Sequence, residues 1–409
     1  MKDFTRRSVV GMGACGVLAT MVTGARAAKN YDTGVTDAEI KLGTTAYYSG
    51  PASTAAAYGL AQLAYFQMVN DRGGINGRKV NLISLDNAFS PPKAIEQTRK
   101  LVESDEVFAI AGSLGTPTNV AIQKYLNGKG VPNLFLTSGA ERFNDPREFP
   151  WIVPFYPIYA AQGALFARHI LSQRPAAKIA VHYENDDLGR DYVKGLKQGL
   201  GDKAASMIVK ELSHELSDPT IDSQILDFKA SGADVLLQFT QSKFAAQGIR
   251  VAAALDWHPL HMIASNAGSI GTTFIPAGVQ ASTGVVTATW ERNPADPLQA
   301  DHPAVRDFKA FAAQYMPNLD LNNAAALPGY NNAYMIDQVL RRCGNELTRA
   351  NLLRQATTLR GISPPMFIDG IGVYNSPDDY RAIHHLQLAR FDGVGLAPIG
   401  KPVMLDGAG

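Results

Sequence analysis

The alternation of short apolar segments with amphipathic segments constrains the fold of this chain more than any other feature of its sequence. In the first part of the chain, strands are expected at 39–43, 80–85, 107–111 and 131–136. The helices expected between them span 55–70, 91–103 and 118–126. Because strands separated by helices pair in parallel, this order predicts a doubly wound α/β sheet.

The same alternation begins again after a proline-rich segment at 149–157. Helices are expected from about 160 and at 191–199, 221–230 and 244–254, with strands at 178–182, 207–212 and 234–239. Two complete α/β sets predict two similar lobes. Residues 285–365 contain further helices, and β-like segments follow at 366–368, 372–374 and 384–391. We expect this last third to cross back and complete both lobes; a third domain is the alternative.

Residues 1–27 have the features of an export signal. Arg6 and Arg7 precede an apolar stretch rich in small residues, and Ala25-Arg26-Ala27 matches a cleavage pattern, so we expect the mature chain to begin at Ala28 in the periplasm. An uncleaved signal anchor is the alternative. The run Thr5-Arg6-Arg7-Ser8 resembles a twin-arginine signal, which would imply export after folding.

Composition and motifs exclude several function classes. The formal net charge is +1 and no Lys/Arg run occurs, which argues against nucleic-acid binding. No phosphate-loop, H-E-x-x-H, C-x-x-C or G-x-S-x-G motif occurs, so we expect no enzyme, no cofactor and no metal site.

After cleavage only Cys343 remains, and we expect it to be a buried helix residue. The pairs Asp186-Asp187 and Asp378-Asp379 lie among turn formers and are expected in solvated loops.

Two polar loops follow expected strands of the first lobe, at 112–118 and 137–140. In open α/β sheets, ligands bind outside the carboxyl ends of strands. Hydroxyl groups and the free N–H groups of a helix start suit a carboxylate. Ordinary helix capping by Thr116 or Thr118 is the alternative explanation for the first loop.

These loops belong to a series of short motifs that runs along the chain. The series comprises Ser49-Gly50-Pro51, Tyr58-Gly59, the run at 70–77, Asp86-Asn87, 112–119, Gly130-Val131-Pro132, Asp187-Leu188-Gly189, Gly329-Tyr330 and 387–393. In order and spacing the chain resembles the periplasmic type I solute-binding proteins of the leucine/isoleucine/valine-binding protein family, from about Ile40 to Gly393.

The resemblance implies two Rossmann-like lobes joined by three crossings, near Tyr156, Val286 and Pro365. Lobe 1 would comprise residues 36–155 plus 287–365, and lobe 2 residues 156–286 plus 366–405. It also implies capture of a small molecule in the cleft and delivery to the permease and ATPase subunits of an ABC importer.

The chain departs from the family at the position that holds an amino acid's ammonium group. The segment matching that acidic position, 261–268, contains no Asp or Glu, and an unpaired buried charge is costly. We therefore expect a small carboxylate ligand without an ammonium group, an aromatic acid in the first place. The expected ligand-binding residues are Tyr47, Phe89, Ser113, Thr116, Thr137, Ser138, Tyr156, Gln241 and Asn266.

Three alternatives stay open. The same fold could bind branched-chain amino acids or small amides if Glu184 or Asp186 supplies the missing acidic group. An exported hydrolase would need a nucleophile–base pair, for which no motif is present. A sensor that presents its closed form to a receptor would have the same sequence features as a transport protein.

Overall fold

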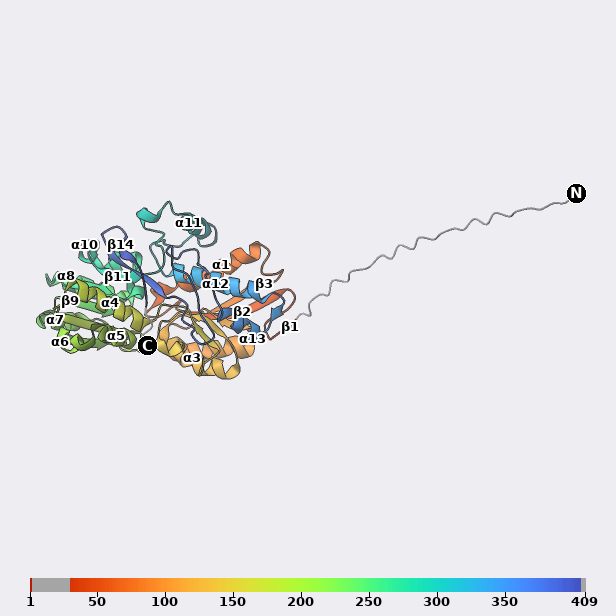
Figure 1. The fold of residues 1–409 in the computed structure, drawn as a ribbon, viewed down its shortest axis with the longest axis horizontal. Coiled ribbons are helices and arrows are strands. Elements are labelled where there is room, and N and C mark those ends of the chain that lie inside the picture. Colours follow the sequence, from red (N-terminus) through yellow and green to blue (C-terminus); the bar gives the residue numbers. More distant parts are fainter. Residues whose placement is uncertain (2–29, 406–409) are drawn as a thin grey trace.

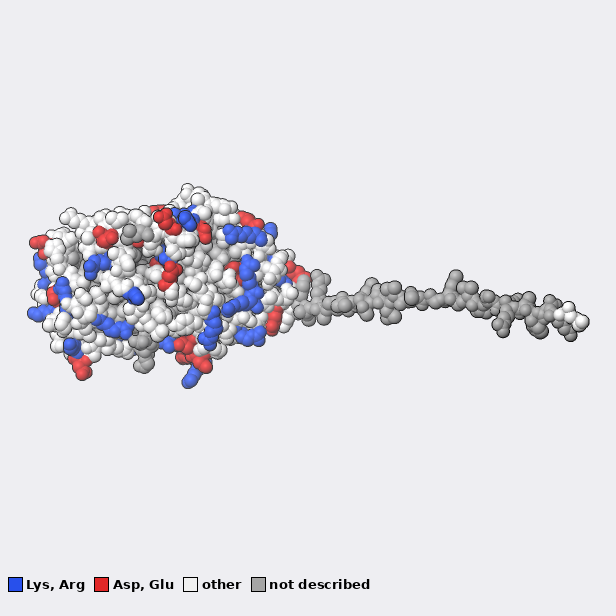
Figure 2. All heavy atoms as spheres, turned by 45° about the horizontal axis from the view of Figure 1, so that its top comes forward, with Lys and Arg blue, Asp and Glu red and all other residues white. Residues whose placement is uncertain are grey.

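The computed structural model describes Met1 and residues 30–405, which form two α/β lobes side by side along the long axis of the molecule (Figure 1). The expected export signal and its cleavage site lie outside the described residues, apart from Met1. No helix in the described part of the chain is long and apolar enough to cross a membrane. Both signs of charge occur across the face shown in Figure 2, in keeping with a formal net charge of +1.

Lobe 1 is built on a five-stranded parallel sheet with the strand order β3-β2-β4-β5-β6. Its strands are β2 (Glu39–Ala46), β3 (Lys79–Asp86), β4 (Ala109–Ala111), β5 (Asn133–Leu136) and β6 (Ile152–Pro154). Its helices are α1 (Ala57–Asp71), α2 (Pro91–Arg99), α3 (Thr116–Lys129), α12 (Ala326–Cys343) and α13 (Arg349–Ala356). The central strands β4 and β5 are buried along their whole length, as expected for a parallel sheet that helices cover. A short parallel pair, β1 (Asn30–Tyr31) with β12 (Glu346–Leu347), joins the start of the described chain to this lobe.

Lobe 2 contains a seven-stranded sheet with the order β14-β13-β11-β10-β9-β7-β8. Its strands are β7 (Ile179–Glu184), β8 (Ile208–His214), β9 (Val235–Phe239), β10 (Leu260–Ile263), β11 (Val286–Thr289), β13 (His385–Phe391) and β14 (Leu396–Met404). Its helices are α4 (Tyr159–Gln173), α5 (Asp187–Leu200), α6 (Ala204–Met207), α7 (Asp222–Ala230), α8 (Ser242–Ala254), α9 (Ile275–Ala277) and α10 (Val279–Ser282). β13 and β14 pair antiparallel at one edge, because the Asp392-Gly393 turn between them reverses the chain.

The chain passes between the two sheets three times. It leaves the first sheet after β6 and leaves the second after Thr289, where β11 ends, rather than near Val286. α11 (Pro303–Tyr315) follows that second crossing. The third crossing pairs with the second: Arg292 N donates to Met366 O and Ile368 N to Trp290 O. Before β13 begins, the Tyr380 backbone N–H and hydroxyl bond to Asn144 and Pro150 of lobe 1.

The predicted α/β architecture with two lobes is confirmed, and the last third of the chain contributes helices to lobe 1 and strands to lobe 2 (Figure 1). The strands that were not predicted are short or lie at edges, as β6, β10, β11 and β14 do. The β-like segments at 366–368 and 372–374 form only isolated bridges. Cys343 is buried on α12, and burial raises the pKa of its thiol to about 12, so it is an inert core residue.

Candidate functional site

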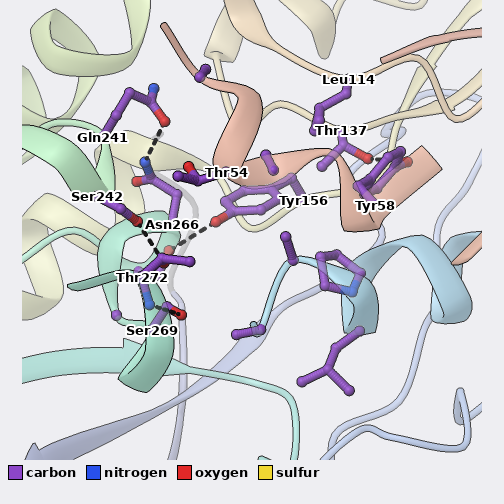
Figure 3. A pocket seen from close by; sticks show the side chains of 18 of the residues that line it. Thr54, Tyr58, Leu114, Thr137, Tyr156, Gln241, Ser242, Asn266, Ser269 and Thr272 are labelled. Carbon is purple, nitrogen blue, oxygen red and sulfur yellow. Dashed lines mark hydrogen bonds between the residues drawn. The ribbon is translucent and has the colours of Figure 1, made fainter. Parts of the chain in front are cut away.

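A cavity of about 190 Å³ lies between the lobes, where strands of both sheets end. In lobe 1 its wall contains Tyr47 after β2, the loop after β4 and Thr137 after β5. In lobe 2 it contains residues after β9, β10 and β11. Figure 3 shows the two sides, with Gln241 and Asn266 on one wall and Thr137 with Tyr58 on the other. The cavity therefore occupies the position at which open α/β sheets bind ligands.

The start of α3 forms the polar end of the cavity in lobe 1. Gly115 precedes the helix with φ +103°, and no side chain caps the helix. A Cβ on Gly115 would lie 1.6 Å from the Tyr47 hydroxyl, so only glycine fits there. Thr116 Oγ1 lies 2.8 Å from Ser138 Oγ. The first N–H groups of the helix are thus available to a ligand oxygen, beside a pair of hydroxyl groups.

Thr137 belongs to a second hydroxyl pair. Its Oγ1 lies 2.7 Å from the Tyr58 hydroxyl, which also donates to Gly112 O at 2.8 Å. Burial raises the pKa of Tyr58 far above its usual value, so the hydroxyl stays protonated. Tyr58 was not among the predicted ligand-binding residues, although Tyr58-Gly59 was one of the family motifs.

Aromatic rings form much of the apolar wall. Tyr47 and Phe89 meet edge to face with ring centroids 4.5 Å apart, and Tyr156 and Trp290 do so at 4.7 Å. Phe89 has a left-handed backbone, with φ +56°, because Asn87 Oδ1 accepts a hydrogen bond from its N–H in a tight turn. Such walls suit a flat or branched apolar group.

Neutral side chains line the lobe 2 wall. Asn266 Nδ2 donates to Thr240 O at 3.1 Å and to Gln241 Oε1 at 3.3 Å. Its Oδ1 is buried without a hydrogen-bond partner among the described residues. Thr272 bonds to Ser242 and Ser269 on the same wall (Figure 3). A ligand group that donates a hydrogen bond could satisfy the Asn266 oxygen.

The structure overturns the expectation that Asp186 lies in a solvated loop. Asp186 caps α5 by accepting from Gly189 N at 3.2 Å, and it lies next to Glu184, whose side chain is 1% exposed. Both Glu184 oxygens and Asp186 Oδ2 are buried without hydrogen-bond partners among the described residues. Burial and the neighbouring Asp186 charge raise the pKa of Glu184, and burial raises the pKa of Asp186 to about 6.

Glu184 and Asp186 lie behind the cavity wall and are not part of its lining. Glu184 interacts with Gln241, and its charge and that of Asp186 act on the hydroxyl of Tyr47. Gln241 and Tyr47 both line the cavity. The chain therefore has an acidic pair near the cleft, on a different strand from the segment that aligns with the family's acidic position.

Seven of the nine predicted ligand-binding residues line the cavity: Tyr47, Phe89, Thr116, Thr137, Tyr156, Gln241 and Asn266. Ser113 and Ser138 do not. Ser113 Oγ lies 2.5 Å from Asn119 Oδ1 and 2.9 Å from Asn133 Oδ1, inside lobe 1, and Ser138 supports Thr116 from behind. Their strand-end positions were predictable, but the direction of each side chain was not.

Sequence reasoning missed a carboxyl group in the cavity wall, that of Glu291. Glu291 directly follows Trp290, at the second crossing between lobes. No motif marked it. The segment at 324–328, at the start of α12, also lines the cavity and carried no sequence signal.

The fold and the cleft define a two-lobed binding protein, and comparisons with known proteins agree. The chain belongs to the periplasmic binding protein family, whose family model matches residues 39–395. The Leu/Ile/Val-binding protein homolog 7 of Brucella abortus (strain 2308) is 31% identical over 215 residues, 49% of this chain and 52% of the relative. The Leu/Ile/Val-binding protein of Escherichia coli (strain K12) is 22% identical over 174 residues, 42% of this chain and 46% of the relative. The matched region thus spans about half the length of these curated relatives, and the resemblance noted from the sequence is confirmed.

Solved structures show the same fold over almost the whole chain. A branched chain amino acid ABC transporter from Thermus thermophilus with bound valine has a TM-score of 0.79 at 19% identity, over 90% of this chain and 97% of the other. A fatty acid ABC transporter substrate-binding protein from Thermomonospora curvata has a TM-score of 0.74 at 20% identity, over 92% of this chain and 95% of the other.

Proposed function

We propose that this protein is the periplasmic substrate-binding protein of an ABC importer, and that its cleft captures a small carboxylate with an apolar body. The observation that carries the proposal is the cavity between the lobes, which combines the uncapped start of α3 at one end with aromatic walls. Valine and fatty acids, the ligands named for two structural relatives, share this chemistry.

The carboxylate binds at the start of α3. The free N–H groups and the positive end of the helix dipole favour an anion there, and the Thr116 hydroxyl lies beside them. Thr137 borders the same end of the cavity.

An aromatic acid is the first candidate ligand. Tyr47, Phe89 and Tyr156 line the cavity with aromatic rings against which a further ring can pack, and the neutral Gln241 and Asn266 supply hydrogen bonds from lobe 2. A ligand that touches both lobes favours the closed state and presents it to the permease and ATPase subunits.

An amino acid is the second candidate, favoured by the buried acidic pair of Glu184 and Asp186. Two carboxyl groups that share a buried site repel each other, and an ammonium group beside them would relieve that repulsion. Glu184 interacts with Gln241, the charges of the pair act on the Tyr47 hydroxyl, and both of these neighbours line the cavity.

Matched ligand pairs test the proposal and separate its two candidates. The purified mature protein is melted with 3-phenylpropanoate or L-phenylalanine, and with 4-methylpentanoate or L-leucine, which differ only in the α-ammonium group. A ligand at 100 times its Kd stabilises the folded state by about 2.7 kcal/mol and raises Tm by several degrees. Shifts with the acids support the first candidate, and shifts with the amino acids support the second.

Glu184→Gln adds a direct test of the second candidate. It should abolish the shift with amino acids and leave any shift with the acids, whereas the exposed control Glu148→Gln should change neither. If none of the four compounds, nor any longer-chain carboxylate, shifts Tm, the proposed ligand class is wrong.

A further inference from the structure

The Glu291 carboxyl is a polar group in the cavity wall that the proposed function does not use. It lines the cavity at the second crossing, between the residues of β11 and Arg292. A carboxyl group that has left bulk water requires hydrogen bonds or a counter-ion.

The protein supplies this carboxyl group with one hydrogen bond. Asn331 Nδ2, on the buried first half of α12, donates to Glu291 Oε1 at 2.7 Å. Asn331 Oδ1 in turn accepts from Met366 N at 3.2 Å, which fixes the orientation of the amide. Among the described residues, the other oxygen, Oε2, has no hydrogen-bond partner. Asn331 therefore holds the carboxyl group in place and leaves Oε2 as an acceptor.

No cation of the described chain compensates Glu291. Arg292, its neighbour, pairs with Asp369 at 2.5 Å. Lys243 lines the same cavity, but its Nζ lies 4.6 Å from the Phe244 ring centroid and bonds to Asp218 O. Removal from water raises the pKa of Glu291 to about 8, with the Asn331 hydrogen bond acting in the opposite direction.

The groups around Glu291 are aromatic and hydroxylic. Its charge acts on the hydroxyls of Tyr58 and Tyr156, whose rings line the cavity, and Trp290 precedes it. Glu184 and Asp186 act instead on Tyr47. The two acidic sites therefore face different sets of tyrosines, and Glu291 lies where an apolar ligand body would pack.

We infer that Glu291 is a specificity-determining residue of the cleft, whose Oε2 accepts a hydrogen bond from a hydroxyl or ammonium group that the ligand carries in addition to its carboxylate. The inference rests on the proposed function, because it assumes a carboxylate ligand in this cavity. It narrows the ligand class to acids that also bear a donor.

The variant Glu291→Gln tests the inference. The glutamine Oε1 can still accept from Asn331 Nδ2, and its NH₂ group then takes the place of Oε2, so a ligand donor would meet a donor. Isothermal titration at pH 8.5, where a carboxyl group with a pKa of about 8 is mostly ionised, uses 3-phenylpropanoate as the parent, 3-(4-hydroxyphenyl)propanoate for the hydroxyl group and L-phenylalanine for the ammonium group. Glu148→Gln, an exposed site, is the matched control.

We expect the wild-type protein to bind one of the two donor compounds at least about 10-fold more tightly than the parent, as for a hydrogen bond to a charged group. Glu291→Gln should reduce that preference to less than about threefold and leave the affinity for the parent nearly unchanged. Which compound shows the preference identifies the donor as hydroxyl or ammonium. Glu291→Ala, which removes both oxygens, should lose the preference as well.

Three outcomes would overturn the inference. A wild-type protein that prefers the parent has no acceptor at this position. A preference that survives in both Glu291 variants comes from other residues, and in either case the proposed function still stands. If the wild-type protein binds none of the three compounds, the ligand is neither an aromatic acid nor an aromatic amino acid and the inference fails, whereas the proposed function still stands if a branched or longer-chain carboxylate binds.

Discussion

Three histidine side chains lie inside lobe 2, near the strand ends that support the cleft. His261 Nε2 lies 2.7 Å from Gln238 Oε1, and His182 Nδ1 lies 3.2 Å from Gln238 Nε2. His214 Nε2 lies 3.0 Å from Thr240 Oγ1. Burial lowers the pKa of all three, to about 4 for His214 and about 3 for His261. The lobe is therefore built around neutral imidazoles.

Acid should destabilise the ligand-free protein through these groups. A histidine that titrates near 6.5 when unfolded and near 4 when folded binds more protons in the unfolded state between those pH values. Above pH 6.5 the imidazole is neutral in both states and the free energy of unfolding is unaffected. As pH falls, the unfolded state takes up the proton first, which lowers the free energy of unfolding by roughly 3 kcal/mol at pH 4. His214→Gln, whose amide can still bond to Thr240, should flatten the fall in Tm between pH 6.5 and 4, measured by calorimetry.

The exposed His258 supplies the control for that experiment. His258→Gln should leave the pH profile of Tm as it is in the wild-type protein. An equal slope for the wild-type protein and His214→Gln would show that His214 titrates alike in the folded and unfolded states.

At the scale of elements, the loop between β4 and α3 decides what the polar end of the cavity can hold. It places Gly115 against the Tyr47 hydroxyl and begins a helix of 14 residues with no side-chain cap. A helix whose first N–H groups are unpaired lacks the stabilisation that a side-chain cap provides, typically about 1 kcal/mol. Here the vacant N–H groups face a cavity, where a ligand oxygen can take the place of the cap.

Alanine variants at Gly115 and Gly128 separate the effect of this loop from a general effect of alanine in the helix. Gly115→Ala places a methyl group at φ +103° and 1.6 Å from Tyr47 Oη, so we expect at least a 10-fold loss of ligand affinity and a lower Tm. Gly128→Ala, in the same helix with open space around it, should raise Tm slightly and leave affinity unchanged. Tm and Kd of both variants check this, and unchanged binding by Gly115→Ala would contradict it.

At the scale of the whole molecule, the two lobes touch beside the cavity. Leu216, after β8 of lobe 2, packs against the Tyr47–Phe89 cluster of lobe 1. Arg142 and Asp187 pair at 2.9 Å across the same boundary. Such contacts exist only while the lobes are together, so they contribute to the closing equilibrium.

Shortening Leu216 should therefore weaken closure. Leu216→Ala removes part of an apolar contact worth about 1–2 kcal/mol, and we expect Kd for a bound carboxylate to rise about 5- to 30-fold. Because Leu216 also packs against a core cluster of lobe 2, the Tm of the variant without ligand should fall slightly. Leu226→Ala, at a side chain that is 50% exposed, is the control, and small-angle scattering with and without ligand measures closure. Equal affinity in both variants would show that Leu216 does not take part in closing.

Periodicity was enough to predict the local elements and the two-lobed architecture, because apolar spacing follows the geometry of a helix or a strand over a few residues. The strand-end loops containing Thr116 and Thr137 were predicted for the same reason. Ser113 was misplaced because side chains that follow one another at a strand end point in different directions, and its hydroxyl turns to Asn119 and Asn133. β10 and β11 were missed because polar residues, His261 in the first and Thr287 in the second, interrupt their short apolar runs.

The acidic groups of the cleft depended on contacts between distant parts of the chain. The sequence around Asp186 predicted an exposed turn, but in the fold Asp186 caps α5 beside the buried Glu184. Glu291 is positioned by a hydrogen bond from Asn331 of α12 and by the pairing of the second and third crossings. Burial and charge compensation are sums over neighbours that are close in space but remote in sequence. Local spacing therefore determined the strands, helices and lobes of this protein, whereas long-range packing determined which polar atoms face the cavity without a partner.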